Sequence, residues 1–247
     1  MMDYGTAEKF YELSLSSNAI DSPVVFCNAI SLYFRSRKDS KAKKLIDEGL
    51  SRFPGNPDIK EFLGKYYFEV ADYGRASSVL EEVIDAKPRV IDSYALLSVI
   101  ALEISRDPEK AQSILKEGLS YNPGQIVLLN NLAYSYLIGN KIDEARAILD
   151  NAQSAEYPVL YATRGLLLIK EGNVKEGSHL YNFAISLCTR DQVLANLLKQ
   201  KKWLELGRYY MNKGNKVEAL KYFKKASRLT SKYSYFKDEA KELIKSI

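Results

Sequence analysis

The stretch between residues 203 and 226 constrains the fold more than any other part of the 247-residue sequence. Its first half has four residues at the i, i+3, i+4, i+7 spacing of one helical face: Trp203, Leu206, Gly207 and Tyr210. After a Lys-Gly-Asn turn, three residues share one face of a second helix: Ala219, Phe223 and Ala226. Small residues let two helices approach closely, and large residues fill the space between them. We therefore predict a helical hairpin whose apolar face must be covered by neighbouring units.

The same pairing of a small residue with a large one four positions later recurs along the chain. The small residues are Ala42, Ala76, Ala111, Ala145, Gly177 and Ala219. They are separated by intervals of 34, 35, 34, 32 and 42 residues. A proline follows each of the first three by twelve positions, at Pro54, Pro88 and Pro123. This near-constant period predicts six repeats that start near residues 23, 57, 92, 126, 158 and 200.

The pattern W-x2-L-G-x2-Y followed by A-x3-F-x2-A resembles the tetratricopeptide repeat, a helix–turn–helix unit of 34 residues. The resemblance implies an all-α fold, a right-handed α-solenoid of such repeats over residues 23–230. It also implies a function in protein–protein interaction, as a scaffold, an adaptor or a subunit of a larger assembly. An alternative is a regulatory sensor module that responds to a peptide or to nucleic acid through its basic C-terminal part.

The two ends of the array are predicted to be capped, as solenoid ends require. Residues 1–22 resemble a leading half repeat, because Ala7 and Tyr11 have the spacing of a second helix. Residues 231–247 form an amphipathic pattern whose apolar positions are Tyr233, Phe236, Ala240, Leu243, Ile244 and Ile247. The longest interval in the array contains eight extra residues, so we expect an extended helix over about 191–213.

Composition and motifs favour a soluble binding protein over an enzyme. No stretch of eighteen apolar residues suggests a membrane span, and the polar start of the chain lacks the features of a signal peptide. Cys27 and Cys188 form no disulfide framework, so we expect a reducing, cytoplasmic location. His179 is the single histidine and has no visible co-ligand, base or nucleophile, which favours a structural role. We predict no catalytic site, no metal site and no cofactor.

The resemblance implies that the first helices of the repeats line a concave, partner-binding groove. Its candidate residues are Asn28, Phe34, Phe68, Leu96, Ile100, Ile104, Val127, Asn130, Asn131, Tyr134, Ile138 and Leu166. Asn28 and Asn131 hold a position where related proteins bond the backbone of a peptide, although a solvated polar residue is the alternative for each. Either this largely apolar face takes up a hydrophobic segment of a partner, or a tight superhelix buries part of it.

Charge is concentrated near the C-terminus. Residues 199–247 contain fourteen Lys and Arg but five Asp and Glu, within a chain of net charge +5. Four of these basic residues form an outward stripe: Lys221, Lys224, Lys225 and Arg228. The stripe is either a solvated helix face or a surface that attracts an acidic protein. Nucleic acid is less favoured, because no nucleic-acid-binding motif accompanies the stripe.

Overall fold

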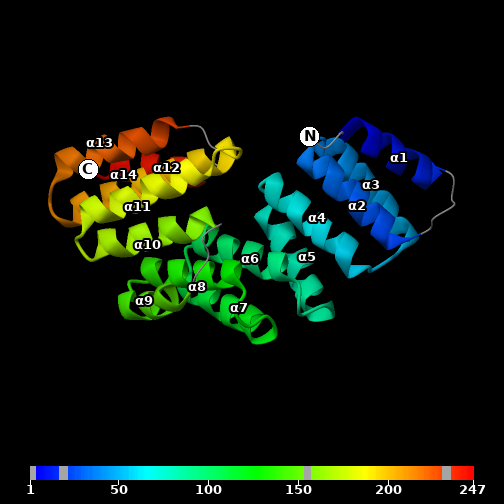
Figure 1. Cartoon of the computed structure of the whole chain (residues 1–247), viewed down its shortest axis with the longest axis horizontal. Helices are drawn as coiled ribbons and strands as arrows, with labels where there is room; N and C mark the ends of the chain where they lie inside the picture. Colours follow the sequence, from blue (N-terminus) through cyan, green and yellow to red (C-terminus); the bar gives the residue numbers. More distant parts are fainter. Residues whose placement is uncertain (1–3, 17–21, 153–156, 230–234) are drawn as a thin grey trace. The chain divides into compact units, whose positions relative to one another are not determined.

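The structure is a computed structural model that describes residues 4–16, 22–152, 157–229 and 235–247. These residues form α-helices and one π-helical segment, η1, without any strand, which confirms the predicted all-α fold (Figure 1). In chain order the helices are α1 (Tyr4–Ser16), α2 (Pro23–Arg35), α3 (Asp39–Arg52), α4 (Pro57–Glu69), α5 (Tyr73–Ala86), α6 (Ile91–Val99), η1 (Ile100–Ile104), α7 (Pro108–Tyr121), α8 (Ile126–Ile138), α9 (Ile142–Asn151), α10 (Pro158–Lys170), α11 (Val174–Leu187), α12 (Gln192–Asn212), α13 (Lys216–Arg228) and α14 (Tyr235–Lys245).

Local chemistry sets where several helices begin. Pro23, Pro57 and Pro158 occupy the first position of α2, α4 and α10, where the missing N–H of proline costs nothing. The side chain of Asn56 accepts hydrogen bonds from two backbone N–H groups at the start of α4, both at 3.1 Å. Asp191 accepts from the N–H of Leu194 at 2.9 Å. These caps satisfy orphan donors at the helix ends. The first helices of five repeats begin within one residue of the expected positions, whereas α12 begins at Gln192, eight residues before the expected start near 200.

The recurring small and large residues explain how the two helices of a repeat pack. A Cβ atom placed on Gly64 would lie 2.5 Å from a methyl carbon of Leu80 on the paired helix α5. A Cβ atom on Gly207 would lie 2.4 Å from the ring of Phe223 on α13. The six recurring small residues of the sequence pattern are all buried. The absence of a side chain at Gly64 and Gly207 therefore permits the close approach of the two helices of a repeat.

Unit 1 comprises residues 1–100 and 120–122. Within it, α2 packs on α3, α4 packs on α5, and α1 packs on α2. Its hydrophobic core is centred on Phe26, Ile30, Ile46 and Ile59, which are fully buried. The side chain of Ala7, which the sequence analysis placed in a second helix, lies outside the described part of α1.

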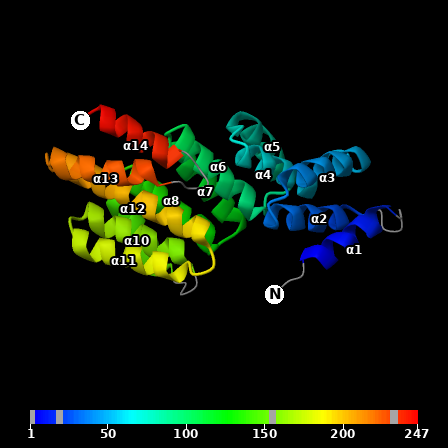
Figure 2. The ribbon, with the colours of Figure 1, turned by 90° about the horizontal axis from the view of Figure 1, so that it is seen from above.

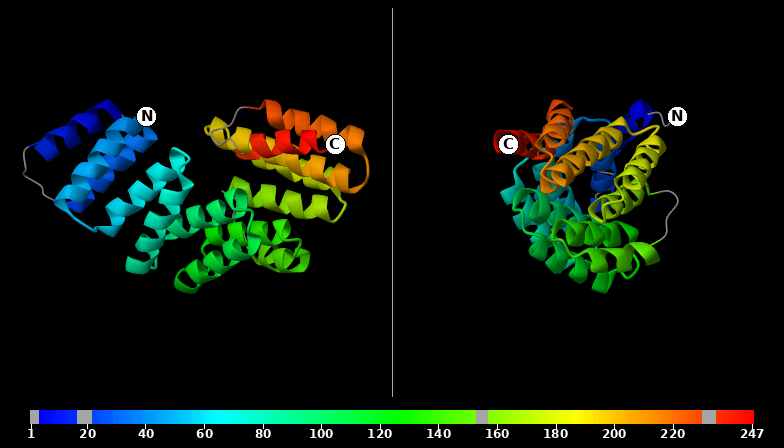
Figure 3. Two further views of the ribbon diagram at one scale, coloured as in Figure 1. Left: turned by 180° about the vertical axis from the view of Figure 1, so that it is seen from behind. Right: turned by 90° about the vertical axis from the view of Figure 1, so that its left-hand side faces the viewer.

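Unit 2 comprises residues 101–119 and 123–247. Helix α10 packs on α11, α11 on α12 and α12 on α13, and Figures 2 and 3 show these four helices side by side. The extended helix expected from the sequence corresponds to α12, which has 21 residues. Helix α14 lies against α13 and α12 and buries Phe236 and Ala240. Residues 231–234 of the predicted cap, Tyr233 among them, lie outside the described residues.

Candidate interaction surfaces

In unit 1, the candidate groove residues differ in their exposure. Asn28 is exposed, Phe34 and Leu96 are half-buried, and Phe68 and Ile100 are buried. Helix α2 presents an exposed to half-exposed stripe at i, i+4, i+7 and i+11 spacing, formed by Val24, Asn28, Ser31 and Arg35. Val24 is 64% exposed, which is unusual for an apolar side chain. We call the surface around this stripe the inner face of unit 1. It combines an exposed amide with an exposed apolar residue.

Aromatic stacking and ion pairs fix the surroundings of this stripe. The rings of Phe34 on α2 and Phe62 on α4 stack with centroids 6.1 Å apart and an interplanar angle of 16°. Lys65 on α4 pairs with Glu61 at 2.8 Å and with Asp92 at 2.7 Å. Lys65 of α4 is therefore already neutralised, while Val24 and Asn28 on α2 are exposed.

Cys27 lies beside the stripe and is not an activated nucleophile. Burial raises the pKa of its thiol to about 11, and the negative charges of Asp58 and Glu61 add to this effect. A thiol with such a pKa stays protonated at neutral pH, whereas nucleophilic catalysis requires the thiolate. Cys27 is therefore a half-buried packing residue.

In unit 2, several candidate groove residues are buried. Asn130, Tyr134 and Leu166 are exposed by 6% or less. The other four are half-buried: Ile104, Val127, Asn131 and Ile138. The side-chain oxygen of Asn130 has no hydrogen-bond partner among the described residues. The sequence left open whether the apolar face is an open groove or is partly buried within the superhelix. Tyr134 and Leu166 belong to the buried part.

A group of buried and half-buried charged residues lies around Tyr134 in unit 2. The ammonium of Lys201 lies 3.1 Å from the centroid of the Tyr134 ring, a cation–π geometry. Arg208, one turn further along α12 than Glu205, forms ion pairs with Glu205 and with Glu239 of α14. Glu103 of η1 borders a cavity of about 120 Å³ together with Arg208 and Glu239. We call these five charged residues the inner network: Glu103, Lys201, Glu205, Arg208 and Glu239.

Burial acts on the pKa values of three members of the inner network, Glu103, Lys201 and Arg208. It raises the pKa of Glu103 to about 7, and the positive charge of Lys201 only partly opposes this rise. It lowers the pKa of Lys201 to about 8, although Glu103 and Glu205 counteract it. Burial also disfavours the charge of Arg208, but the carboxylates of Glu205 and Glu239 outweigh it and raise the pKa of the guanidinium. Electrostatically, the network is a set of mutually dependent buried charges.

The sequence analysis did not identify the inner network, although two signals were present. Lys201, Glu205 and Arg208 follow one another at i, i+4 and i+7 on a face that is otherwise buried. The interval from Ala76 to Ala111 is one residue longer than the repeat period, and η1 lies inside it. A π-helical turn accommodates one extra residue in a helix and is frequent at functional sites.

Arg164 has a structural role that the sequence did not reveal. Its guanidinium donates hydrogen bonds to the carbonyl oxygens of Leu149 at 2.7 Å and Ala152 at 2.6 Å. These carbonyls end helix α9, whose last turn lacks helical partners for them. Arg164 of α10 therefore caps the C-terminus of the preceding helix.

The basic stripe on α13 is exposed along its whole length, at Lys221, Lys224, Lys225 and Arg228. Lys221 is paired with Glu218, one turn earlier, at 3.1 Å. Lys225 instead lies over the ring of Tyr222, 5.4 Å from its centroid. The four residues therefore differ in how far their charge is already compensated.

Two classes of feature are absent from the part of the chain that the structure describes. It contains no group of three or more His, Cys, Asp and Glu side chains able to hold a metal ion. None of its helices combines the length and the apolar character needed to cross a membrane.

Comparison with known proteins decides the family. Residues 194–233, which contain most of α12 and all of α13, match the family model of the tetratricopeptide repeat. This segment is a tetratricopeptide repeat, and the chain has the fold of tetratricopeptide-repeat proteins. A tetratricopeptide repeat protein from Parabacteroides merdae ATCC 43184 has a similar solved structure, with a TM-score of 0.64 and 17% sequence identity, over 98% of this chain and 91% of that chain. No curated protein matches the sequence.

Two further solved structures share the fold of this tetratricopeptide-repeat protein. TTC0263, a thermophilic repeat protein of Thermus thermophilus, is 19% identical, with a TM-score of 0.60, over 75% of this chain and 99% of that chain. YrrB, described as having an unusual peptide-binding site, is 16% identical, with a TM-score of 0.52, over 77% of this chain and 97% of that chain. At these identities the likeness concerns the fold of the repeat protein and leaves its partner open.

Proposed function

We propose that this repeat protein is a non-catalytic scaffold that binds an extended segment of a partner protein along the inner face of unit 1. The observation that carries the proposal is the stripe on α2, where Val24 and Asn28 are both exposed. An asparagine amide offers a donor and an acceptor together, which suits the N–H and C=O groups of an extended backbone. Val24 would contact an apolar side chain of the same segment.

The surroundings of the stripe support this function. The stacked Phe34 and Phe62 rings give the face a fixed shape, and pre-organisation lowers the entropic cost of binding. The raised thiol pKa of Cys27 favours a binding role over a catalytic one at this face. YrrB, which shares the fold, has a peptide-binding site by its description. We further propose that the protein acts as an adaptor within a larger assembly in the cytoplasm, where its two free thiols would stay reduced.

The test uses peptides selected for binding to the full chain from a displayed random library. A selected peptide should bind the Val24→Glu, Asn28→Ala double variant at least about tenfold more weakly, because a charge and a lost amide both act at the contact. The matched control is Val217→Glu on α13, since Val217 is 78% exposed and lies in unit 2. Isothermal titration calorimetry measures the affinities, and circular dichroism checks that helicity is retained.

Equal affinity of the double variant and the wild type for the selected peptides would refute the assignment to α2. The second candidate function, a sensor module that uses the basic C-terminal part, makes a different prediction. It is favoured by the exposure of all four stripe residues on α13. In that case charge reversal at Lys224 and Arg228, and not the change at Val24, would abolish binding.

A further inference from the structure

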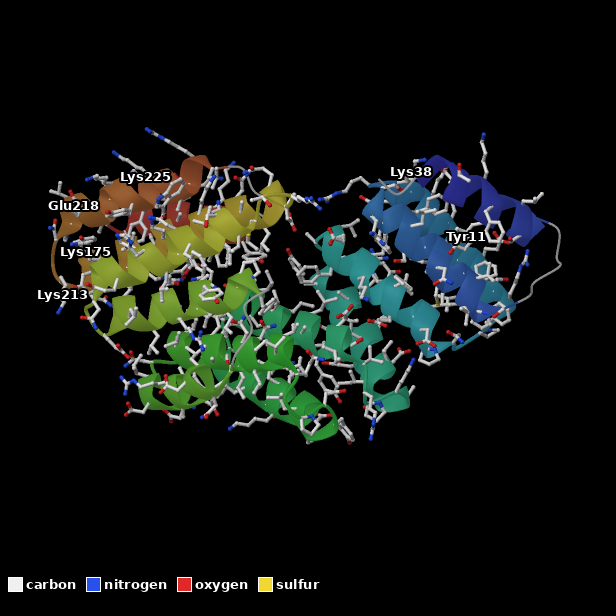
Figure 4. All side chains as sticks on the ribbon, in the orientation of Figure 1. Tyr11, Lys38, Lys175, Lys213, Glu218 and Lys225 are labelled. Atoms are coloured by element: carbon white, nitrogen blue, oxygen red, sulfur yellow. The ribbon has the colours of Figure 1, made fainter. Side chains whose placement is uncertain are left out.

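A second surface of unit 2 has unpaired cations beside exposed apolar side chains. It extends over the successively packed helices α11, α12 and α13. We define the lysine–phenylalanine patch by its six members: Asn182, Phe183, Leu187, Lys202, Tyr222 and Lys225. Figure 4 labels Lys225, which projects from α13.

The apolar part of the patch lies on α11. Phe183 is 47% exposed, and Leu187, one turn later on the same helix, is 38% exposed. The ring of Phe183 meets that of Tyr161 edge to face, with centroids 5.0 Å apart and an interplanar angle of 86°. This contact holds the Phe183 ring in place while leaving much of it accessible. Adjacent exposed apolar side chains of this kind are typical of protein contact sites, whereas isolated ones are not informative.

The charged part of the patch begins at Asn182, the residue that precedes Phe183 on α11. The ammonium of Lys202 on α12 donates a hydrogen bond to the side-chain oxygen of Asn182 at 2.8 Å. Asn182 precedes Phe183 in the chain, so this bond connects the apolar part to the charged part. Burial lowers the pKa of Lys202, and repulsion from Lys225 lowers it further. The charge of Lys225 thus acts on Lys202 from the neighbouring helix α13, which packs against α12.

The second lysine is held by aromatic contacts. Lys225 lies over the ring of Tyr222 at 5.4 Å, and Tyr222 stacks on Tyr210 with an interplanar angle of 1° and centroids 5.6 Å apart. Neither Lys202 nor Lys225 has an ion pair with any residue that the structure describes. Lys221, by contrast, is neutralised by Glu218. An anion placed between Lys202 and Lys225 would relieve their repulsion and gain two charge-assisted contacts.

We propose that the lysine–phenylalanine patch docks a segment of a second protein that carries acidic side chains next to apolar ones. Acidic side chains of the segment would complement the positive charges of Lys202 and Lys225. Its apolar side chains would cover the exposed Phe183 and Leu187. Tight nucleic-acid binding by charge commonly uses about six to ten phosphate contacts, whereas the patch offers two lysines that have no ion pair among the described residues. Of the four residues in the basic stripe, only Lys225 belongs to this docking site. Lys202 of α12, which is outside the stripe, is its second lysine.

The experiment uses the full chain and a fluorescein-labelled synthetic peptide with glutamates on one side and two leucines one helical turn apart. Fluorescence anisotropy should show saturable binding, weakened at least about tenfold by the Lys202→Glu, Lys225→Glu double variant. Phe183→Ser, or Leu187→Ser if the former does not fold, should weaken binding at least about fivefold. A peptide with serine in place of both leucines should bind more weakly than the parent peptide.

Matched controls separate this surface from general electrostatics. Lys175→Glu on α11 and Lys216→Glu on α13 change exposed lysines outside the patch, so binding should stay within about twofold of the wild type. The charge-preserving Lys202→Arg, Lys225→Arg variant should retain binding. No saturable binding of the probe, or equal losses in the Lys175→Glu control, would overturn the proposal. Tighter binding of oligothymidylate than of the peptide, lost in the same double variant, would overturn it in favour of nucleic acid.

The patch and the proposed groove can fail separately. Val24→Glu in unit 1 should leave binding of the acidic peptide unchanged, because Val24 belongs to the other unit. Conversely, the Lys202→Glu, Lys225→Glu variant should still bind the peptides selected for the inner face of unit 1.

Discussion

Replacing Gly64 with alanine tests the close crossing of α4 and α5. The new Cβ would lie 2.5 Å from Cδ2 and 2.6 Å from Cγ of Leu80. Ordinary carbon–carbon contacts are about 3.5–4.0 Å, so the helices or the leucine must move by about 1 Å. Leu80 is fully buried and has little room to rotate. Overpacking of this kind costs about 1–3 kcal/mol.

Alanine also favours the helix over glycine, by about 0.5–1 kcal/mol, because it has less backbone freedom to lose. The expected net effect of Gly64→Ala is therefore a destabilisation of about 1–2 kcal/mol. Gly74 provides the matched control, since it lies in α5 of the same repeat and its added Cβ would meet nothing within 4 Å. Gly74→Ala should stabilise unit 1 by the propensity term alone.

Urea unfolding followed by circular dichroism measures both variants against the wild type. The two changes should differ in sign, because the same substitution meets Leu80 in one position and open space in the other. A Gly64→Ala variant as stable as Gly74→Ala would refute the close crossing of α4 and α5, and with it the packing role of Gly64.

Two further predictions concern unit 2. Because burial raises the pKa of Glu103 from 4.5 to about 7, the folded chain binds this proton more tightly than the unfolded chain, and stability should fall as pH rises through that range. Glu103→Gln should reduce this loss of unfolding free energy, by at most about 3 kcal/mol. Urea titrations at successive pH values measure it, and the same pH dependence in the variant as in the wild type would contradict the assignment to Glu103. Arg164→Met should cost about 2 kcal/mol in the same assay, because two carbonyls at the end of α9 lose a charged donor. Arg106→Met removes a pair with Glu242 in which both side chains are more than 60% exposed, so a cost as large as that of Arg164→Met would argue against the cap.

The hairpins were predictable because their determinants are local. Proline and asparagine at the start of α4 act within four residues, and the pairing of Gly64 with Leu80 acts within one repeat. These short-range patterns recur at a near-constant period, so an all-α fold of helical repeats could be predicted from the sequence. The period even contained a trace of η1, as the one-residue excess between Ala76 and Ala111.

The state of the inner face was less predictable because it depends on how far each repeat rotates against the next. No local pattern encodes that rotation, so Tyr134 and Leu166 could be assigned to a face but not to the open or the buried part of it. The structure buries both of them. The inner network was missed for the same reason, since Glu103 and Lys201 are far apart in the sequence and meet only through the curvature of unit 2.

The position of α14 has a consequence for how unit 2 folds. In a linear repeat array each repeat contacts only its neighbours, so the ends can fray and repeats can be added or removed. Here Glu239 of α14 borders the same cavity as Leu102 and Glu103, and Glu242 pairs with Arg106, 136 residues earlier in the chain. The last helix of unit 2 thus lies beside the first residues of the same unit. Inserting or deleting a single repeat would separate these partners, so the repeat number of unit 2 is fixed by its own geometry, and its unfolding should be cooperative across the whole unit.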